Sequence, residues 1–173
     1  MKQEKSPEEN RNEVLLKAKS DALRLLSFSP RSIEELRKRL ALKKYAPEIV
    51  AQVVELLKKQ GFLNDKKFAE LFAQSRVHSR PAGKKQLAFD LQKKGLSKEV
   101  VAGAMANLGD YDEKKAAKEL VFGRFQRMSG ISDEKKKARI FGFLKRRGFS
   151  NDVIFPVLRE LFKKNDSLFP SED

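Results

Sequence analysis

The sequence predicts an all-α protein made of tandem three-helix repeats in an elongated, curved body, with the last repeat reduced to two helices. Three observations predict this fold class. Apolar residues recur at helical spacing along nearly all of the 173 residues. Helix start and stop signals divide the chain into separate segments. The chain also matches itself in three places, as repeat architectures do.

The first two helices are marked by their start signals. Ser6 and Pro7 predict the start of a first helix that runs toward Phe28. Ser32 and Glu35 form a capping-box pattern, in which the hydroxyl and the carboxylate each satisfy a backbone amide that a helix start leaves unpaired. A second helix is therefore expected to begin at Ser32.

The next two helices are marked in the same way. Pro47 suits the first turn of a third helix, and Gly61 suits the turn that ends it. Asn64 or Asp65 then caps a fourth helix. Few later stretches favour strands, so helices are expected to follow one another along the chain.

The self-match covers three helices. From the first copy to the second, its spacing is 51 residues for the first two helices and 48 for the third, so the connection is three residues shorter in the second copy. In the first two helices, the positions of Leu36, Leu40, Tyr45 and Glu48 match Leu87, Leu91, Leu96 and Glu99, and then Ile140, Leu144, Phe149 and Asp152. In the third helix, the positions of Asn64, Asp65, Phe68 and Arg76 match Asp112, Glu113, Ala116 and Arg124. Shared caps and first-turn acids argue against chance similarity.

These matches predict the organisation of the chain. The expected parts are an N-terminal tail with the first helix at 1–30, repeats at 31–80 and 81–130, a partial repeat at 131–164, and a mobile C-terminal tail at 165–173. Small helical units cannot bury their apolar faces alone, so they are expected to stack.

Composition excludes several classes of protein. The chain has no Cys, which removes disulfides, thiolate catalysis and sulfur-ligated metal sites and suits a reducing compartment. No segment approaches the roughly 18 uninterrupted apolar residues of a membrane span. The first residues, MKQEKSPEENRNE, are too charged for a signal peptide. We therefore expect a cytoplasmic protein.

Net charge predicts an acidic partner. The chain carries 38 Lys and Arg against 24 Asp and Glu, a formal net charge of +14. Residues 124–164 alone hold twelve basic and four acidic residues. Such an excess attracts polyanions, whereas a merely soluble surface mixes the two signs.

The sequence does not favour an enzyme. His78 is the one histidine, and it lies beside Ser79 and Arg80 at a predicted helix end, where capping or exposure is the simpler role. The acids that resemble a metal-ligand set fall mostly at helix starts, where capping explains them: Asp65, Asp110, Asp112 and Glu113. We therefore expect no catalytic residue, no cofactor and no metal.

Four aromatic residues suggest two different roles. Exposed rings can stack on nucleic-acid bases, as in single-strand binding proteins. The helical spacing of the residues favours packing in the core instead: Phe122, Phe125, Phe141 and Phe143.

Several spaced motifs resemble the RecX family. They are the run from Ser32 to Leu40, GFLNDKKFAELFAQSR from Gly61 to Arg76, the series Gly83, Leu87, Leu91, Lys94, Gly95, and LKRRGFS from Leu144 to Ser150. The resemblance covers about residues 20 to 162, and its elements agree in order. The chain differs at Asn64 and at Pro81, which fall in a cap and a loop.

The resemblance implies a regulator of the bacterial recombinase RecA. Such a protein would lie in the groove of the RecA filament on single-stranded DNA and mainly inhibit it, lowering filament growth, ATP hydrolysis, strand exchange and co-protease activity. It would thereby act in DNA recombination, DNA repair and the SOS response. Direct DNA contact is also open, and a monomer is expected. The alternative from composition is a sequence-independent nucleic-acid-binding helical repeat protein.

The candidate contact residues are basic positions off the apolar stripes. They are Arg37, Arg39, Lys43, Lys84, Lys93, Lys94, Lys136, Lys145, Arg146 and Arg147. Each could instead be a solvated side chain without a specific contact. Lys43, Lys94 and Arg147 match in the repeat and are better candidates, although a basic residue at a helix end can also complement the negative end of the helix dipole.

Overall fold

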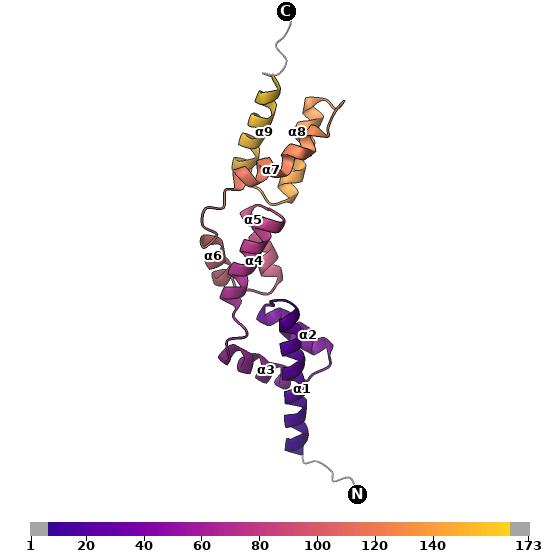
Figure 1. Cartoon of the computed structure of the whole chain (residues 1–173), viewed down its shortest axis with the longest axis vertical. Helices are drawn as coiled ribbons and strands as arrows, with labels where there is room; N and C mark the ends of the chain where they lie inside the picture. Colours follow the sequence, from indigo (N-terminus) through magenta and orange to yellow (C-terminus); the bar gives the residue numbers. More distant parts are fainter. Residues whose placement is uncertain (1–6, 167–173) are drawn as a thin grey trace, which may run out of the picture. The chain divides into compact units, whose positions relative to one another are not determined.

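The computed structural model describes residues 7–166, with side chains from 8 to 163, and this part of the chain is helical without strands (Figure 1). The helices are α1 (Pro7–Phe28), α2 (Ile33–Leu42), α3 (Pro47–Lys59), α4 (Asp65–Ser79), α5 (Lys84–Lys93), α6 (Lys98–Ala106), α7 (Glu113–Gln126), α8 (Asp133–Arg146) and α9 (Asn151–Asp166). The predicted all-α class is confirmed. The predicted cap Ser6 and residues 167–173 of the predicted tail lie outside the described residues. None of the helices described here is long and apolar enough to cross a membrane.

The chain forms two compact units. Unit 1 comprises Met1–Leu71 and Leu91–Gly103, and unit 2 comprises Phe72–Asp90 and Ala104–Asp173. The helices α4, α5 and α6 therefore contribute residues to both units.

The core of unit 1 joins α1, α2 and α3. Ala18 and Ala22 of α1 are fully buried against the apolar stripes of the other two helices. The stripes consist of Leu36 and Leu40 in α2 and of Ile49, Val50, Val53, Val54 and Leu57 in α3. Burying each of these large side chains stabilises the unit by about 1.5–3 kcal/mol.

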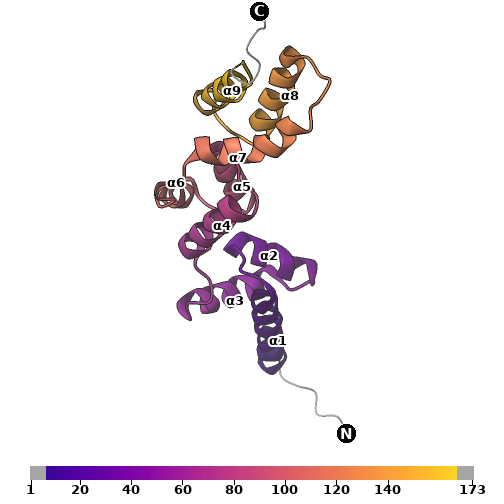
Figure 2. The ribbon, with the colours of Figure 1, turned by 45° about the horizontal axis from the view of Figure 1, so that its top comes forward.

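The core of unit 2 joins α7, α8 and α9, which Figure 2 shows as one group. Ala117 and Val121 of α7 lie at positions that match Ala69 and Ala73 of α4. The other buried members are Ile140, Leu144, Phe149, Ile154, Val157 and Phe162. Phe125, Phe141 and Phe143 pack against this core, which confirms their predicted role. The same prediction is wrong for Phe122, whose side chain is 58% exposed.

Packing groups α1–α3 and α7–α9 in threes, and α4–α6 complete the same three-helix period along the chain. We call α1–α3 the first domain, α4–α6 the second and α7–α9 the third. The predicted repeats follow the same three-helix period counted from α2, so their last copy holds only α8 and α9. Counted from α1, the period gives three complete three-helix domains.

The N-terminal end of α2 is held by two segments of the second domain, all within unit 1. The hydroxyl of Ser32, which is fully buried, donates to the carbonyl oxygen of Lys94 at 2.5 Å. It also accepts from the amide of Glu35 at 3.1 Å and completes the predicted capping box. The amide of Ile33 donates to Oδ1 of Asp65 at 2.9 Å.

The N-terminal end of α5 is held in the same way by the third domain, all within unit 2. The amide of Gly83 donates to the carbonyl oxygen of Arg147 at 2.9 Å. The amide of Lys84 donates to Oε1 of Glu113 at 2.9 Å. A Cβ atom on Gly83 would overlap the carbonyl group of Gly148, so only glycine fits this approach. The junction between successive domains is therefore itself repeated.

At the starts of α4 and α7, two neighbouring side chains accept hydrogen bonds from two different helices. Asn64 accepts from the amide of Lys67 at 3.0 Å and caps its own helix α4, while Asp65 accepts from the amide of Ile33 at the start of α2. Asp112 accepts from the amides of the second and third residues of α7, while Glu113 accepts from the amide of Lys84 at the start of α5. The sequence left open which of Asn64 and Asp65 is the cap, and the structure assigns Asn64.

Candidate binding surface

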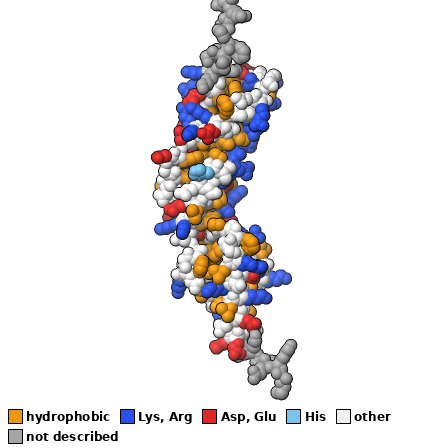
Figure 3. Space-filling model, in the orientation of Figure 1, with side chains coloured by type: hydrophobic (Ala, Val, Ile, Leu, Met, Phe, Trp, Pro, Cys, Tyr) orange, Lys and Arg blue, Asp and Glu red, His pale blue; other side chains and the backbone are white. Residues whose placement is uncertain are grey.

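The ten candidate basic residues fall into two groups. Four have side chains held by other parts of the protein: Lys43, Lys94, Lys136 and Arg147. Five others are exposed along helices or at helix starts: Arg37, Arg39, Lys84, Lys145 and Arg146. Of these, Lys145 also donates to Oδ1 of Asn151 at 2.8 Å. Lys93 is exposed as well. Figure 3 shows Lys and Arg side chains gathered over α2 in unit 1 and over α8 in unit 2.

The repeated positions Lys43, Lys94 and Arg147 act first as connectors. The ammonium group of Lys43 lies 3.0 Å from Asp21 of α1. The ammonium group of Lys94 lies 2.7 Å from Glu35 of α2. These side chains are therefore placed by partners within their own unit, in addition to their position at helix ends.

The Lys43 contact makes stability depend on pH. The hydrogen bond from Lys43, and after it the one from the Tyr45 hydroxyl at 2.9 Å, lowers the pKa of Asp21 below its ordinary value of 3.8. Because the folded pKa is the lower one, the carboxylate stabilises the fold above that ordinary value. This stabilisation is lost as pH falls through the folded pKa.

Asp21→Asn is expected to destabilise unit 1 at neutral pH, because Lys43 and Tyr45 lose their charged partner. The difference from the parent chain should shrink as pH falls from about 6 to about 2, since the parent carboxylate is then protonated as well. Urea unfolding followed by circular dichroism at several pH values measures this difference. A difference that stays constant with pH would contradict the assignment.

Arg147 lies at the centre of an arginine cluster in unit 2. One guanidinium nitrogen donates to the carbonyl oxygen of Pro81 at 3.2 Å. Burial, followed by the charges of Arg80, Arg76 and Arg124, lowers the pKa of Arg147 below its usual value. Guanidinium groups bind phosphate and carboxylate groups well, so these arginines are a candidate site for such anions.

The cluster is organised by one aromatic ring and one helix end. The guanidinium groups of Arg124 and Arg147 lie 4.3 Å and 5.5 Å from the ring centre of Phe143. Arg76 donates to the backbone carbonyl of Arg80 and pairs with Asp90 at 3.4 Å. Arg80 and Arg124 are the exposed members of the cluster. We call Arg76, Arg80, Arg124 and Arg147 the arginine cluster.

Sequence reasoning found only Arg147 of this cluster. Arg76 and Arg124 were visible as matching positions in the repeat, but their convergence depends on how α4, α7 and the end of α8 pack. Arg80 follows a helix end and carried no signal of its own. The repeat match was the one clue in the sequence.

The remaining polar candidates have local roles. His78 is exposed, and its Nδ1 lies 2.7 Å from the carbonyl oxygen of Gln74 one turn earlier. Asp65, Asp112 and Glu113 are engaged with helix starts. In the part of the chain that the structure describes, no three His, Cys, Asp or Glu side chains gather as they do around a metal ion.

Three family models match the chain in order. They describe the first, second and third three-helix domains of RecX, and they match residues 18–57, 64–105 and 111–158 respectively. These ranges follow the domains counted from α1.

Relatives and solved structures agree with the family models. The chain is 34% identical over 145 residues to the regulatory protein RecX of Mycolicibacterium smegmatis, covering 82% of this chain and 77% of the relative. It is 35% identical over 147 residues to that of Mycolicibacterium vanbaalenii, covering 82% and 80%. The crystal structure of RecX from Lactobacillus salivarius matches with a TM-score of 0.76 at 24% identity, covering 87% of this chain and 97% of that one. A second crystal structure, of a regulatory protein RecX, matches with a TM-score of 0.79 at 20% identity, covering 91% and 81%.

Proposed function

The chain belongs to the RecX family of regulatory proteins, and from this premise we propose that it regulates the recombinase RecA in the cytoplasm. As a monomer, it binds in the groove of the RecA filament on single-stranded DNA and mainly inhibits it. Filament growth, ATP hydrolysis, strand exchange and co-protease activity all fall as a result. The catalysis belongs to the partner.

One observation carries this proposal: all three RecX domains are present in order, and each unit exposes basic side chains. Arg37 and Arg39 project from α2 in unit 1, and Lys145 and Arg146 project from the end of α8 in unit 2. The arginine cluster adds four charges to unit 2. A filament groove offers acidic protein surface and DNA phosphate, and both attract such groups.

Several weak contacts in one chain can give tight binding. After one domain binds, the others face neighbouring filament subunits at a high effective concentration. Individual basic residues can then contribute little, while the whole chain still acts at low concentration.

The proposal is tested by ATP hydrolysis. The chain is added to assembled RecA filaments on single-stranded DNA at fewer than about one copy per RecA subunit. We expect hydrolysis to fall under these conditions. Unchanged hydrolysis up to equal concentrations would refute the proposal.

The alternative is a nucleic-acid binder without sequence preference, which the arginine cluster favours. The two functions differ in their salt dependence. A binder driven by phosphate contacts loses affinity for bare single strands log-linearly, with a slope of about −0.7 per contact. Fluorescence anisotropy with a labelled dT oligonucleotide at several salt concentrations measures this slope. A steep slope, together with filament effects that begin only when bare DNA is coated, would favour the alternative.

A further inference from the structure

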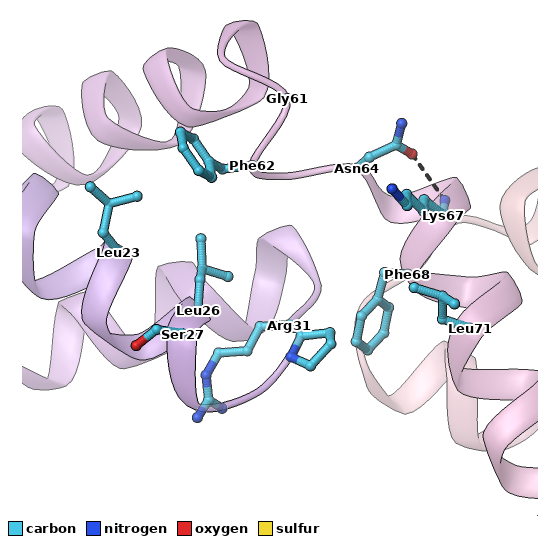
Figure 4. Close-up of a pocket in the computed structure, with 11 residues that line it drawn as sticks. Leu23, Leu26, Ser27, Arg31, Gly61, Phe62, Asn64, Lys67, Phe68 and Leu71 are labelled. Carbon is cyan, nitrogen blue, oxygen red and sulfur yellow. Dashed lines mark hydrogen bonds between the residues drawn. The ribbon is translucent and has the colours of Figure 1, made fainter.

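The first two domains each end in a pocket that receives the next domain. In unit 1, a pocket of about 610 Å³ lies between the end of α1 and the start of α4. Figure 4 shows Leu26 of α1 and Phe62 on one side, with Phe68 and Leu71 of α4 on the other. The first helix of the second domain thus forms one wall of this pocket.

The second domain repeats the arrangement in unit 2. A pocket of about 430 Å³ is lined by residues that match those of the first pocket in the repeat. Val77, His78 and Pro81 stand 51 residues after Leu26, Ser27 and Pro30, while Asp112, Lys115, Ala116 and Glu119 stand 48 residues after Asn64, Lys67, Phe68 and Leu71. Here α7 forms the wall that α4 forms in the first pocket.

In the third domain, the described residues form the corresponding pocket without such a wall. It measures about 950 Å³. Phe125 and Gln126 in its lining match Val77 and His78, 48 residues earlier. Among the described residues, no helix follows α9 to cover it. The uncovered surface is apolar, and we call Phe122, Phe125, Met128 and Leu161 the open socket.

We propose that the open socket binds an amphipathic helix of a partner protein, as the first two domains hold α4 and α7. The inference rests on the repeat geometry and stands apart from the proposed action on RecA. Two features define the occupant. Both α4 and α7 begin with an Asn or Asp cap followed by an acid, and both bury two apolar residues one turn later, Phe68 and Ala69 in α4 and Ala116 and Ala117 in α7. The rim of the socket bears Lys118, Lys136 and Lys163 against the single acid Glu160, which pairs with Lys118. The rim therefore keeps a positive charge that suits an acidic helix start.

A second copy of this chain does not fit as the occupant. Its own first helix, α1, has Lys17 at the position where α4 has Phe68 and α7 has Ala116. A head-to-tail contact through α1 would therefore place a charged side chain in an apolar socket.

The ring of Phe125 in the socket is poorly placed to stack on a nucleic-acid base. The ring of Phe125 meets Phe162 at 5.2 Å in an edge-to-face arrangement. The ammonium group of Lys136 lies 5.6 Å from the centre of the same ring. Since the ring already has these neighbours, it offers little free face for stacking on a base.

The test uses the full chain and a peptide with the sequence of residues 62–79 as the helical probe. The chain has three methionines, of which Met128 lines the socket and Met105 lies in α6. In NMR spectra of the chain with ¹³C-methyl methionine, adding the peptide should shift the methyl signal of Met128 and leave that of Met105 unchanged. A scrambled peptide of the same composition serves as the control. The proposal is overturned if Met128 does not shift, or if the scrambled peptide shifts it equally.

Two matched variants distinguish binding of the peptide at the socket from non-specific binding elsewhere on the surface. Phe122→Ser should lower the affinity of the chain for the peptide at least about tenfold, because this ring is exposed at the socket and its loss leaves the core intact. Phe89→Ser changes a ring of similar exposure on α5 and should leave binding unchanged. Equal affinity of both variants, or a Met128 shift caused by a dT oligonucleotide and not by the peptide, would contradict a helix-binding socket.

Discussion

Gly148→Ala is expected to lower the free energy of unfolding by about 3 kcal/mol. Gly148 has a φ of +77°, a left-handed conformation that costs other residues about 1–2 kcal/mol. A Cβ atom there would also lie 2.6 Å from the backbone nitrogen of Gln86. The close approach of the α8–α9 connection to the start of α5 therefore needs glycine.

Gly61→Ala separates the two causes. Gly61 has the same φ of +77°, but a Cβ atom added there meets nothing within 4 Å. The substitution should lower the free energy of unfolding by only about 1–2 kcal/mol. Urea unfolding of both variants, followed by circular dichroism, gives the comparison. Equal losses would show that the junction does not depend on this close approach.

Arg80→Gln combined with Arg124→Gln is expected to raise the concentration for half-maximal inhibition of RecA about tenfold, equivalent to about 1.4 kcal/mol. The two side chains are the exposed members of the arginine cluster, so they are the ones that can reach an anion. Glutamine keeps much of their length and removes both charges. ATP hydrolysis by RecA filaments measures the effect.

Lys59→Gln combined with Lys98→Gln is the matched control, because it removes two exposed charges outside the cluster. It should change the half-maximal concentration by less than about twofold if the location of the charge matters more than its sum. If the two double variants are equally impaired, the cluster has no special role. Circular dichroism of both variants shows whether the fold is retained.

Most of the fold followed from local signals in the sequence. The capping box at Ser32 and Glu35 forms as predicted, and the matched apolar positions Leu36, Leu87 and Ile140 are fully buried. These features depend on neighbours within a turn or on helical periodicity, and the sequence displays both directly.

The junctions between domains could not be predicted, because they depend on tertiary placement. An acid at a helix start has the amides of its own helix as the obvious partners. Asp65 and Glu113 instead accept hydrogen bonds from backbone amides at the starts of α2 and α5. Only the packing of successive domains brings these distant amides within reach. The repeat match identified the positions but not their partners.

The candidate site was predicted in part for a similar reason. Charge and repetition singled out Lys43, Lys94 and Arg147, and the structure places each in contact with another segment of its own unit. Sequence spacing cannot distinguish a cation that connects two segments from one that faces a partner. Phe122 shows the same limit, since helical spacing favoured the core and the ring is largely exposed.

The central claim is that the chain acts on the assembled filament and not by coating DNA. Filament length measured by electron microscopy, with the chain at about one copy per ten RecA subunits, tests this most directly. The account predicts shorter filaments at a concentration that leaves bare single-stranded DNA unbound in the same buffer. Filaments of unchanged length until bare DNA is saturated would contradict it.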